Sequence, residues 1–152
     1  MMFRRRAGGL EFLLVHPGGP FWARKDDGVW TIPKGEAAPG EDLLVRAQTE
    51  FQEELGILPS GEWLPLGSVK QRGGKTVHAW AFEGDLPADF ELRSNLFELE
   101  WPPRSGKRTT FPEVDRAEFF DEETARKKIN AAQQIFLDRL LDLLRAQRTS
   151  SA

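Results

Sequence analysis

The chain of 152 residues contains no cysteine and no tyrosine. Without cysteine, neither a disulfide framework nor a thiolate metal site can form. No apolar run approaches the roughly 20 residues of a membrane-spanning helix, and no apolar segment typical of a signal peptide follows the first residues. The formal net charge of −3 gives no overall attraction to nucleic acid or membrane, so an anionic ligand would have to meet a local basic cluster.

These absences predict a soluble, cytoplasmic protein, monomeric or homodimeric, with no membrane partner and no stable nucleic-acid partner. What the chain does contain is apolar and aromatic residues: 39% of it is hydrophobic, with 11 phenylalanines and 5 tryptophans. That composition can fill the core of one domain. We expect this domain to span residues 1–147 and residues 148–152 to form a frayed tail, because no linker, repeat or low-complexity block interrupts the chain.

The hydrophobic pattern is typical of one α/β domain. Glycine pairs favour hairpin turns between the first two and the next two strands. The expected strands are 2–6, 10–15, 62–72, 75–83, 96–101 and 116–120. The expected helices are 41–55, 121–129 and 131–147, and Gly56 stands where a glycine commonly ends a helix. Residues 84–95 and the proline- and arginine-bearing segment 102–113 are expected to be loops.

Three glutamates gather in the helix expected at 41–55. Glu50, Glu53 and Glu54 follow an i, i+3, i+4 spacing, which places their side chains within about 100° of the helix circumference. Like charges at this spacing destabilise a helix, and a divalent cation would relieve the repulsion. Mg²⁺ prefers oxygen ligands from a few carboxylates and from substrate phosphates. The spacing alone fits a solvated acidic helix surface equally well.

The residues around these glutamates narrow the choice. The segment 35–57, "GEAAPGEDLLVRAQTEFQEELGI", has the spacing G-x5-E-x8-E-x2-E-E-x-G and closes on an apolar isoleucine. It resembles the signature of the Nudix (MutT-like) hydrolases. The resemblance implies an α/β/α sandwich with a mixed sheet. It also implies hydrolysis of a diphosphate linkage in a nucleotide or polyphosphate substrate, with Mg²⁺ as the cofactor and Mn²⁺ as the alternative.

The resemblance also implies roles for individual residues. Glu50 and Glu54 would be the main metal ligands, and Glu53 a further ligand or the residue that holds the attacking water. The carbonyl of Gly35 would be a backbone ligand. Glu41 would brace the segment, although an acid in the first turn of a helix is also favoured by the helix dipole alone.

A base must take the proton of the attacking water. In many relatives it is a glutamate well after the signature, and "FPEVDRAEFF" resembles that region. Glu113 is the first choice, with Glu98 and Glu100 as alternatives. Each of the three also fits an ordinary exposed acid.

Substrate contacts would come from outside the signature. Lys34 precedes the signature directly and is placed to neutralise a phosphate next to the cleaved bond. The P-K-G entry is similar to that of the dinucleoside polyphosphate and diphosphoinositol polyphosphate hydrolases. A basic cluster in "PPRSGKR" comprises Arg104, Lys107 and Arg108, and suits either a polyphosphate arm or a plain surface loop. Trp22 could stack on a base or fill the core.

Two departures from the family pattern remain. The tyrosines that stack adenine in many relatives are absent, which leaves Trp63, Trp80 or His78 as replacements. Thr49 stands where the family has arginine, and Arg46, one turn earlier, is the candidate substitute that would support the carboxylates. The departure at Thr49 favours an alternative function, a catalytically weak Nudix-fold module that binds or senses nucleotides. A protein-interaction domain whose acidic helix holds structural Ca²⁺ is a third hypothesis.

Overall fold

The computed structural model describes residues 1–33, 40–57, 61–71 and 73–151. Within these ranges every helix is too short or too polar to cross a bilayer. The elements in chain order are β1 (Met2–Arg6), β2 (Gly9–Pro17), α1 (Leu43–Leu55), β3 (Leu64–Lys70), β4 (Thr76–Glu83), β5 (Leu96–Glu100), β6 (Arg108–Pro112), β7 (Val114–Asp121), α2 (Glu122–Lys128), the 3₁₀ turn η1 (Ala131–Gln133) and α3 (Gln134–Ser151).

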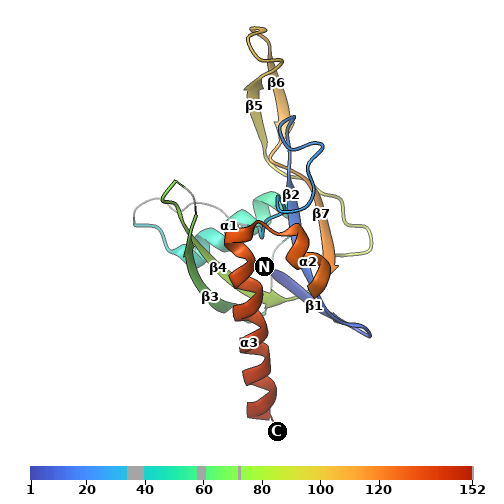
Figure 1. Ribbon diagram of the computed structural model, residues 1–152, viewed down its shortest axis with the longest axis vertical. Helices are drawn as coiled ribbons and strands as arrows, with labels where there is room; N and C mark the ends of the chain where they lie inside the picture. Colours follow the sequence, from blue (N-terminus) through green and yellow to red (C-terminus); the bar gives the residue numbers. More distant parts are fainter. Residues whose placement is uncertain (34–39, 58–60, 72, 152) are drawn as a thin grey trace.

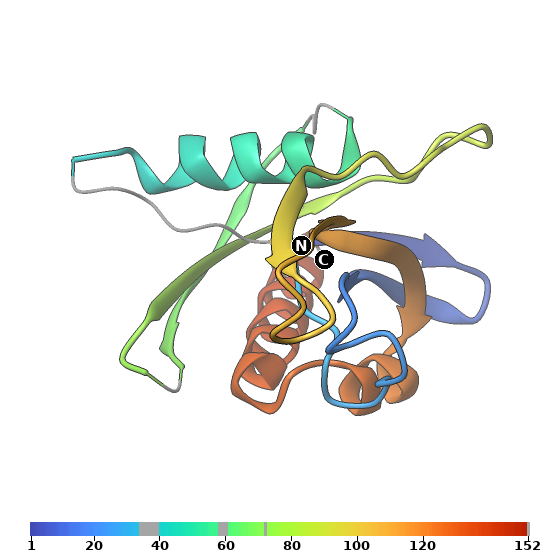
Figure 2. The same cartoon turned by 90° about the horizontal axis from the view of Figure 1, so that it is seen from above.

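Five strands form one mixed sheet in the order β3-β4-β1-β2-β7 (Figure 1). β1 runs parallel to β4, and the other neighbours are antiparallel. Figure 2 shows α1 on one side of this sheet and α2 and α3 on the other. The expected α/β/α sandwich with a mixed sheet is therefore confirmed.

The interior strand β2 shows why two helical layers are needed. Phe12 and Leu14 pack with the residues of α3, whereas Leu13 and Val15 pack with those of α1. Successive side chains of a strand point to opposite faces, so an uninterrupted apolar run has to be covered on both sides. The segment "EFLLV" of β2 thus lies between the two helical layers.

Helix α1 begins and ends at residues that suit its termini. The carboxylate of Asp42 accepts hydrogen bonds from the backbone N–H groups of Leu44 and Val45, and Gly56 ends the helix with a φ of 73°. Phe51 packs edge-on against a sheet phenylalanine, with 5.0 Å between ring centroids. The expected helix 41–55 is confirmed with a start two residues later, because Asp42 is the capping residue rather than part of the first turn.

One expectation about the second half of the chain is wrong. Residues 108–112, assigned to a loop, form β6 and pair with β5, with Phe97 opposite Phe111. The two threonines and the phenylalanine of "RTTFP" favour a strand, and Pro112 lies at its end rather than inside it. α3 runs from Gln134 to Ser151, so it starts and ends later than the helix expected at 131–147. The β5–β6 hairpin projects from the body of the protein (Figure 1).

The outer strand β3 bends at a glycine. The pairing register shifts between Pro65 and Gly67, and Gly67 has a φ of 76°. Arg139 of α3 donates to the carbonyls of Leu66 at 2.9 Å and Ser68 at 3.0 Å. A Cβ on residue 67 would lie 3.0 Å from Nη1 of Arg139. Glycine therefore supplies both the backbone conformation and the space for this arginine.

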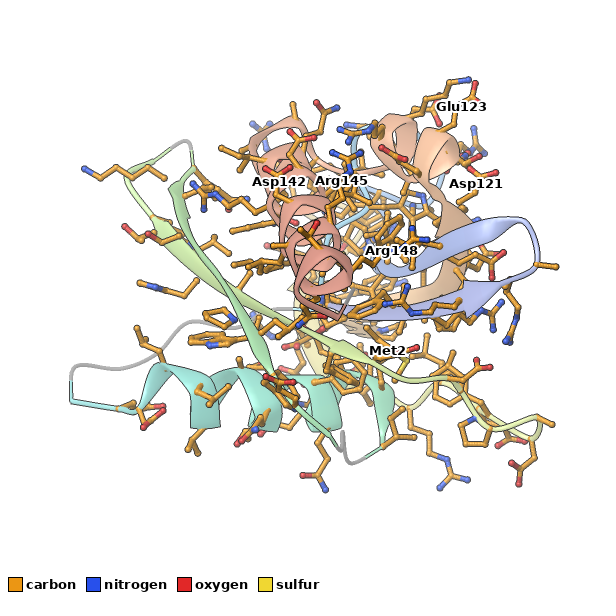
Figure 3. All side chains as sticks on the ribbon, turned by 90° about the horizontal axis from the view of Figure 1, so that it is seen from below. Met2, Asp121, Glu123, Asp142, Arg145 and Arg148 are labelled. Atoms are coloured by element: carbon orange, nitrogen blue, oxygen red, sulfur yellow. The ribbon has the colours of Figure 1, made fainter. Side chains whose placement is uncertain are left out.

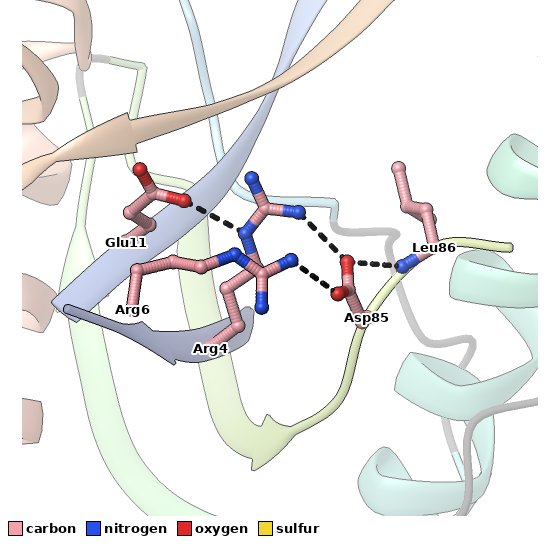
Figure 4. Close-up of polar contacts among 5 residues, drawn as sticks. All are labelled: Arg4, Arg6, Glu11, Asp85 and Leu86. Carbon is pink, nitrogen blue, oxygen red and sulfur yellow. Dashed lines mark hydrogen bonds and ion pairs between the residues drawn. The ribbon is translucent and has the colours of Figure 1, made fainter. Parts of the chain in front are cut away.

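An arginine-aspartate cluster ties β1 to the segment after β4 (Figure 4). Asp85 accepts from Arg4 at 2.8 Å, from Arg6 at 2.5 Å and from the backbone N–H of Leu86 at 2.8 Å. Arg4 also donates to Glu11 at 2.7 Å. The hydrogen bond from Arg4, with those from Arg6 and Leu86, holds the pKa of Asp85 at about 2, below its ordinary 3.8.

Asp85→Asn is expected to lower the free energy of unfolding at pH 7 by about 1 kcal/mol, a figure already reduced for solvent screening because the side chain is 43% exposed. A carboxyl whose pKa is lower in the folded state stabilises the fold above about pH 4 and loses that contribution as the pH falls toward about 2. Urea unfolding of parent and variant, once at pH 7 and once at about pH 2, checks this. The difference should shrink at low pH, and Asp89→Asn, an exposed change in the same segment, should show no such difference.

Candidate functional site

The three glutamates of α1 do not form a solvated surface. Glu50 and Glu54 are each only 9% exposed, and the side chain of Glu53 is 38% exposed. They lie beside Phe51 and Leu55, the buried residues through which α1 packs on the sheet. Burying carboxylates costs free energy unless positive charge or hydrogen bonds compensate. These carboxylates therefore need a positive charge or hydrogen-bond donors close to them.

Arg46 provides such a charge. Its Nη2 forms a close ion pair with Oε1 of Glu50 and lies 3.9 Å from Oε2 of Glu53. Its Nε lies 4.0 Å from Oε2 of Glu41. Thr49 instead donates its hydroxyl to the carbonyl of Val45 at 2.9 Å. The guanidinium that pairs with the glutamates thus belongs to Arg46, one helical turn before Thr49, the position at which the family pattern has arginine.

The carboxylates fit a hard divalent cation in their chemistry. Their oxygens are the ligands that Mg²⁺ prefers, and the guanidinium already lies where positive charge is needed. Within the described ranges, no three histidine, aspartate or glutamate side chains converge on one metal position. Lys34 and Gly35, expected to bind a phosphate and the metal, lie outside the described residues.

Asn95 connects Glu113 to this cluster through two hydrogen bonds. Nδ2 of Asn95 donates to Oε2 of Glu53 at 3.5 Å, and the carbonyl of Asn95 accepts from the backbone N–H of Glu113 at 2.8 Å. The carbonyl of Glu113 accepts a hydrogen bond from the backbone N–H of Gly18 at 2.9 Å. Residue 18 has to be glycine, because a Cβ there would lie 1.9 Å from the carbonyl oxygen of Pro112. Two hydrogen bonds therefore hold the backbone of Glu113, while its side chain is exposed.

The two alternative bases are engaged within the β5–β6 hairpin. Glu98 pairs with Arg108 at 3.3 Å, and Glu100 accepts from the backbone N–H of Gly106 at 2.9 Å. Both stabilise the hairpin itself. Only Glu113, of the three candidates, is linked by a described hydrogen bond to a residue that contacts Glu53.

The expected substrate-binding residues gather at the end of that hairpin. Arg104, Lys107 and Arg108 lie on or next to its turn. Trp22 is 40% exposed, so it does not fill the core, and Nζ of Lys25 lies 5.1 Å from its ring centroid. The neighbouring Phe21 packs edge-on against Trp101, with centroids 5.5 Å apart. The structure brings these residues together on the projecting hairpin and the loop beside it, not along α1.

Sequence reasoning missed two residues that position these loops. Asn95 fell in a segment read as a plain loop, and nothing in the sequence predicts its contact with Glu53. His16 is fully buried, with Nδ1 2.7 Å from Oδ1 of Asp115 and Nε2 2.7 Å from the carbonyl of Lys25. An isolated histidine directly after the apolar strand expected at 10–15 was the available signal. Through these two hydrogen bonds, His16 of β2 holds the loop that contains Trp22 and Lys25 beside β7.

Of the candidate replacements for tyrosine, one has a structural role. Trp63 stacks on Phe82, with centroids 4.6 Å apart and an interplanar angle of 20°, and it is half-buried against the core that contains Phe51. Trp80 is half-buried and His78 is exposed. Trp63 therefore helps to hold α1 on the sheet.

Comparison with known proteins identifies the fold and its relatives. A family model described as the NUDIX domain matches residues 1–140. An asymmetrical bis(5'-nucleosyl)-tetraphosphatase of Rattus norvegicus is 34% identical over 101 residues, which cover 60% of this chain and 63% of that protein. The 8-oxo-dGDP phosphatase NUDT18 of Mus musculus is 32% identical over 85 residues, covering 53% of this chain and 26% of that protein. The chain thus spans less than two thirds of either curated relative.

Solved structures agree with this family at the level of the fold. A binary complex of the C. elegans Ap4A hydrolase superposes with a TM-score of 0.67 at 23% identity, covering 95% of both chains. The E. coli ORF135 protein superposes with a TM-score of 0.54 at 22% identity, covering 95% of this chain and 88% of that one. At these identities the likeness concerns the arrangement of strands and helices.

Proposed function

The chain belongs to the Nudix family, and from this membership we propose that it is a Mg²⁺-dependent pyrophosphohydrolase that cleaves a diphosphate linkage in nucleoside polyphosphates. The observation that carries the proposal is the glutamate cluster of α1. All its carboxylates are present at the family spacing, and two of the three are buried beside the packing face of the helix. A purely structural helix would gain nothing from burying them.

In the proposed reaction, a water oxygen bonds to phosphorus as the bond from phosphorus to the bridging oxygen breaks. Glu50, Glu53, Glu54 and the carbonyl of Gly35 would hold the metal, which supplies charge neutralisation at the phosphate oxygens and acidifies the water. Glu113 takes the proton of that water. Arg46 and Asn95 position the carboxylates, and Glu41 supports Arg46 from its other side.

We propose dinucleoside polyphosphates or nucleoside triphosphates as the substrate class. The rat relative is a tetraphosphatase by name, and the basic residues of the hairpin turn, with Lys34, suit a long phosphate chain. The exposed ring of Trp22 beside Lys25 suits stacking with a base. The hairpin residues would then contact the end of the substrate distant from the cleaved bond.

The test is a screen with diadenosine tetraphosphate, ATP, ADP-ribose and NADH in Mg²⁺ or Mn²⁺, with the products identified. We expect the first two to have the highest kcat/KM. Arg104→Glu combined with Lys107→Glu should raise KM mainly for the longer polyphosphates, by about tenfold if one charge-assisted contact is lost. If ADP-ribose is the best substrate, the proposed substrate class is wrong.

The same screen examines the alternative of a catalytically weak nucleotide-binding module. That alternative is favoured by Thr49 and by the close pairing of Arg46 with Glu50. It predicts that nucleotides bind with micromolar affinity while none is hydrolysed above the background rate. Turnover of any nucleotide in proportion to enzyme concentration would exclude it.

A further inference from the structure

A second concave site lies on the opposite side of the sheet from α1. A cavity of about 410 Å³ opens between the β1–β2 hairpin and the C-terminal half of α3. Figure 3 shows Arg145 and Arg148 on α3 near the hairpin, while α1 lies across the sheet. None of the residues discussed for hydrolysis lines this cavity.

The floor of the cavity is apolar and firmly packed. Leu141 and Leu144 of α3 are 9% and 4% exposed and belong to the core between α3 and the sheet. Gly9, at the start of β2, has a φ of 125° and open space where a Cβ would point. The two leucines thus form the floor before any ligand binds, and Gly9 has no side chain that would cover it.

Of the described residues, four arginines and no acidic residue line the cavity. Arg145 and Arg148 come from one face of α3, because residues three or four apart share a side of a helix. Arg5 faces them from β1, whereas Arg6, the next residue of the strand, points to the other face of the sheet and is bound to Asp85. The three cations that face the cavity are all arginine, the side chain that binds phosphate through paired, parallel hydrogen bonds.

The guanidiniums of Arg5, Arg145 and Arg148 are weakly engaged. Arg5 pairs with Glu83 at 3.4 Å and Arg145 with Asp142 at 3.7 Å, and their side chains are 49% and 73% exposed. The exposed side chain of Arg148 has no ion-pair or hydrogen-bond partner in the described part of the chain. Exposed pairs of this kind contribute little, so these three arginines are free to turn toward a stronger anion.

We propose that this cavity binds a free organic polyphosphate, a molecule with two or more phosphate groups on a body of metabolite size. The phosphates lie between the arginines of α3 and Arg5 of β1, and the organic body lies on the leucine floor. The volume falls within the range of small-molecule sites, about 300–1,000 Å³. The ligand binds separately from the proposed hydrolysis, so the two can be tested independently.

The experiment is a titration of the ¹⁵N-labelled protein with ATP in EDTA, followed by amide chemical shifts. The absence of metal weakens binding at the carboxylates of α1. We expect shifts concentrated at Gly9, Leu10 and residues 141–148. Arg145→Glu combined with Arg148→Glu should raise the dissociation constant at least about tenfold, because two charge-assisted contacts are lost. Inorganic tripolyphosphate, which lacks the organic body, should bind more weakly than ATP.

The matched control is Lys70→Glu with Lys75→Glu, an equal change of charge on exposed residues at the far hairpin of the sheet. It should leave the ATP affinity unchanged. Equal losses in both double variants, or shifts confined to α1, would overturn the proposal. So would retention on phosphatidylcholine vesicles containing a phosphoinositide without binding of ATP, since the phosphates would then belong to a lipid. The arginine variants should hydrolyse the substrate at the parental rate, whatever that rate is.

Discussion

Glu53→Gln and Glu54→Gln are each expected to lower turnover by about 100-fold or more while the fold stays intact. Glutamine keeps the size of the side chain but removes the charge that would hold the metal. Residues that merely orient metal ligands already cost about 10- to 100-fold when they are changed, so a ligand itself should cost at least as much. Steady-state hydrolysis at saturating Mg²⁺ measures the effect.

Glu118→Gln is the control, because it removes the same charge from an exposed position on β7. It should hydrolyse the substrate at the parental rate. Circular dichroism and thermal unfolding of all three variants establish that the loss is not one of structure. Near-parental activity in either Glu53→Gln or Glu54→Gln would exclude that residue from the metal site.

Glu113→Gln is expected to lower kcat by about 10²- to 10⁴-fold, the usual contribution of a positioned general base. The structure favours Glu113 because Asn95 links its backbone to Glu53. Glu98→Gln and Glu100→Gln are matched controls, since these acids are engaged with Arg108 and Gly106 inside the hairpin. Hydrolysis rates and substrate affinity are measured for each variant. A lower kcat with an unchanged substrate affinity would assign the loss to the chemical step.

A large loss in Glu98→Gln or Glu100→Gln, with Glu113→Gln unaffected, would transfer the role to the hairpin. The projecting hairpin would then have to approach α1 during the reaction. Asn95→Ala separates the two cases further. It should reduce turnover about tenfold if Asn95 positions Glu53, and it should have no effect if the hairpin supplies the base.

Local patterns predicted those parts of the fold that local physics determines. The helix of the glutamates, its glycine end and the two glycine-joined hairpins follow from periodicity and backbone preference. Arg46 was predicted as the partner of Glu50 because residues four apart in a helix are neighbours. β6 was missed because "RTTFP" is short, begins with an arginine and ends with a proline, so the loop signals around it outweighed the two threonines and the phenylalanine.

The rest of the candidate site depends on contacts between distant segments. Asn95 meets Glu53 across 42 residues of chain, and no local pattern predicts such a pairing. The basic residues of the hairpin turn were recognised as a cluster, but their distance from α1 depends on the unexpected strand. The roles of Lys34 and Gly35 stay predictions from the family pattern.

The bend at Gly67 has a consequence for the behaviour of the protein in concentrated solution. β3 is an outer strand of the sheet, and the unpaired backbone groups of such strands are where foreign chains add and aggregation starts. Arg139 already occupies the carbonyls of Leu66 and Ser68, and the register shift breaks the flat edge that another strand would need. An intruding strand would have to displace a guanidinium held by two carbonyls. The sheet is therefore closed to extension at β3, and one side chain of α3 keeps it so.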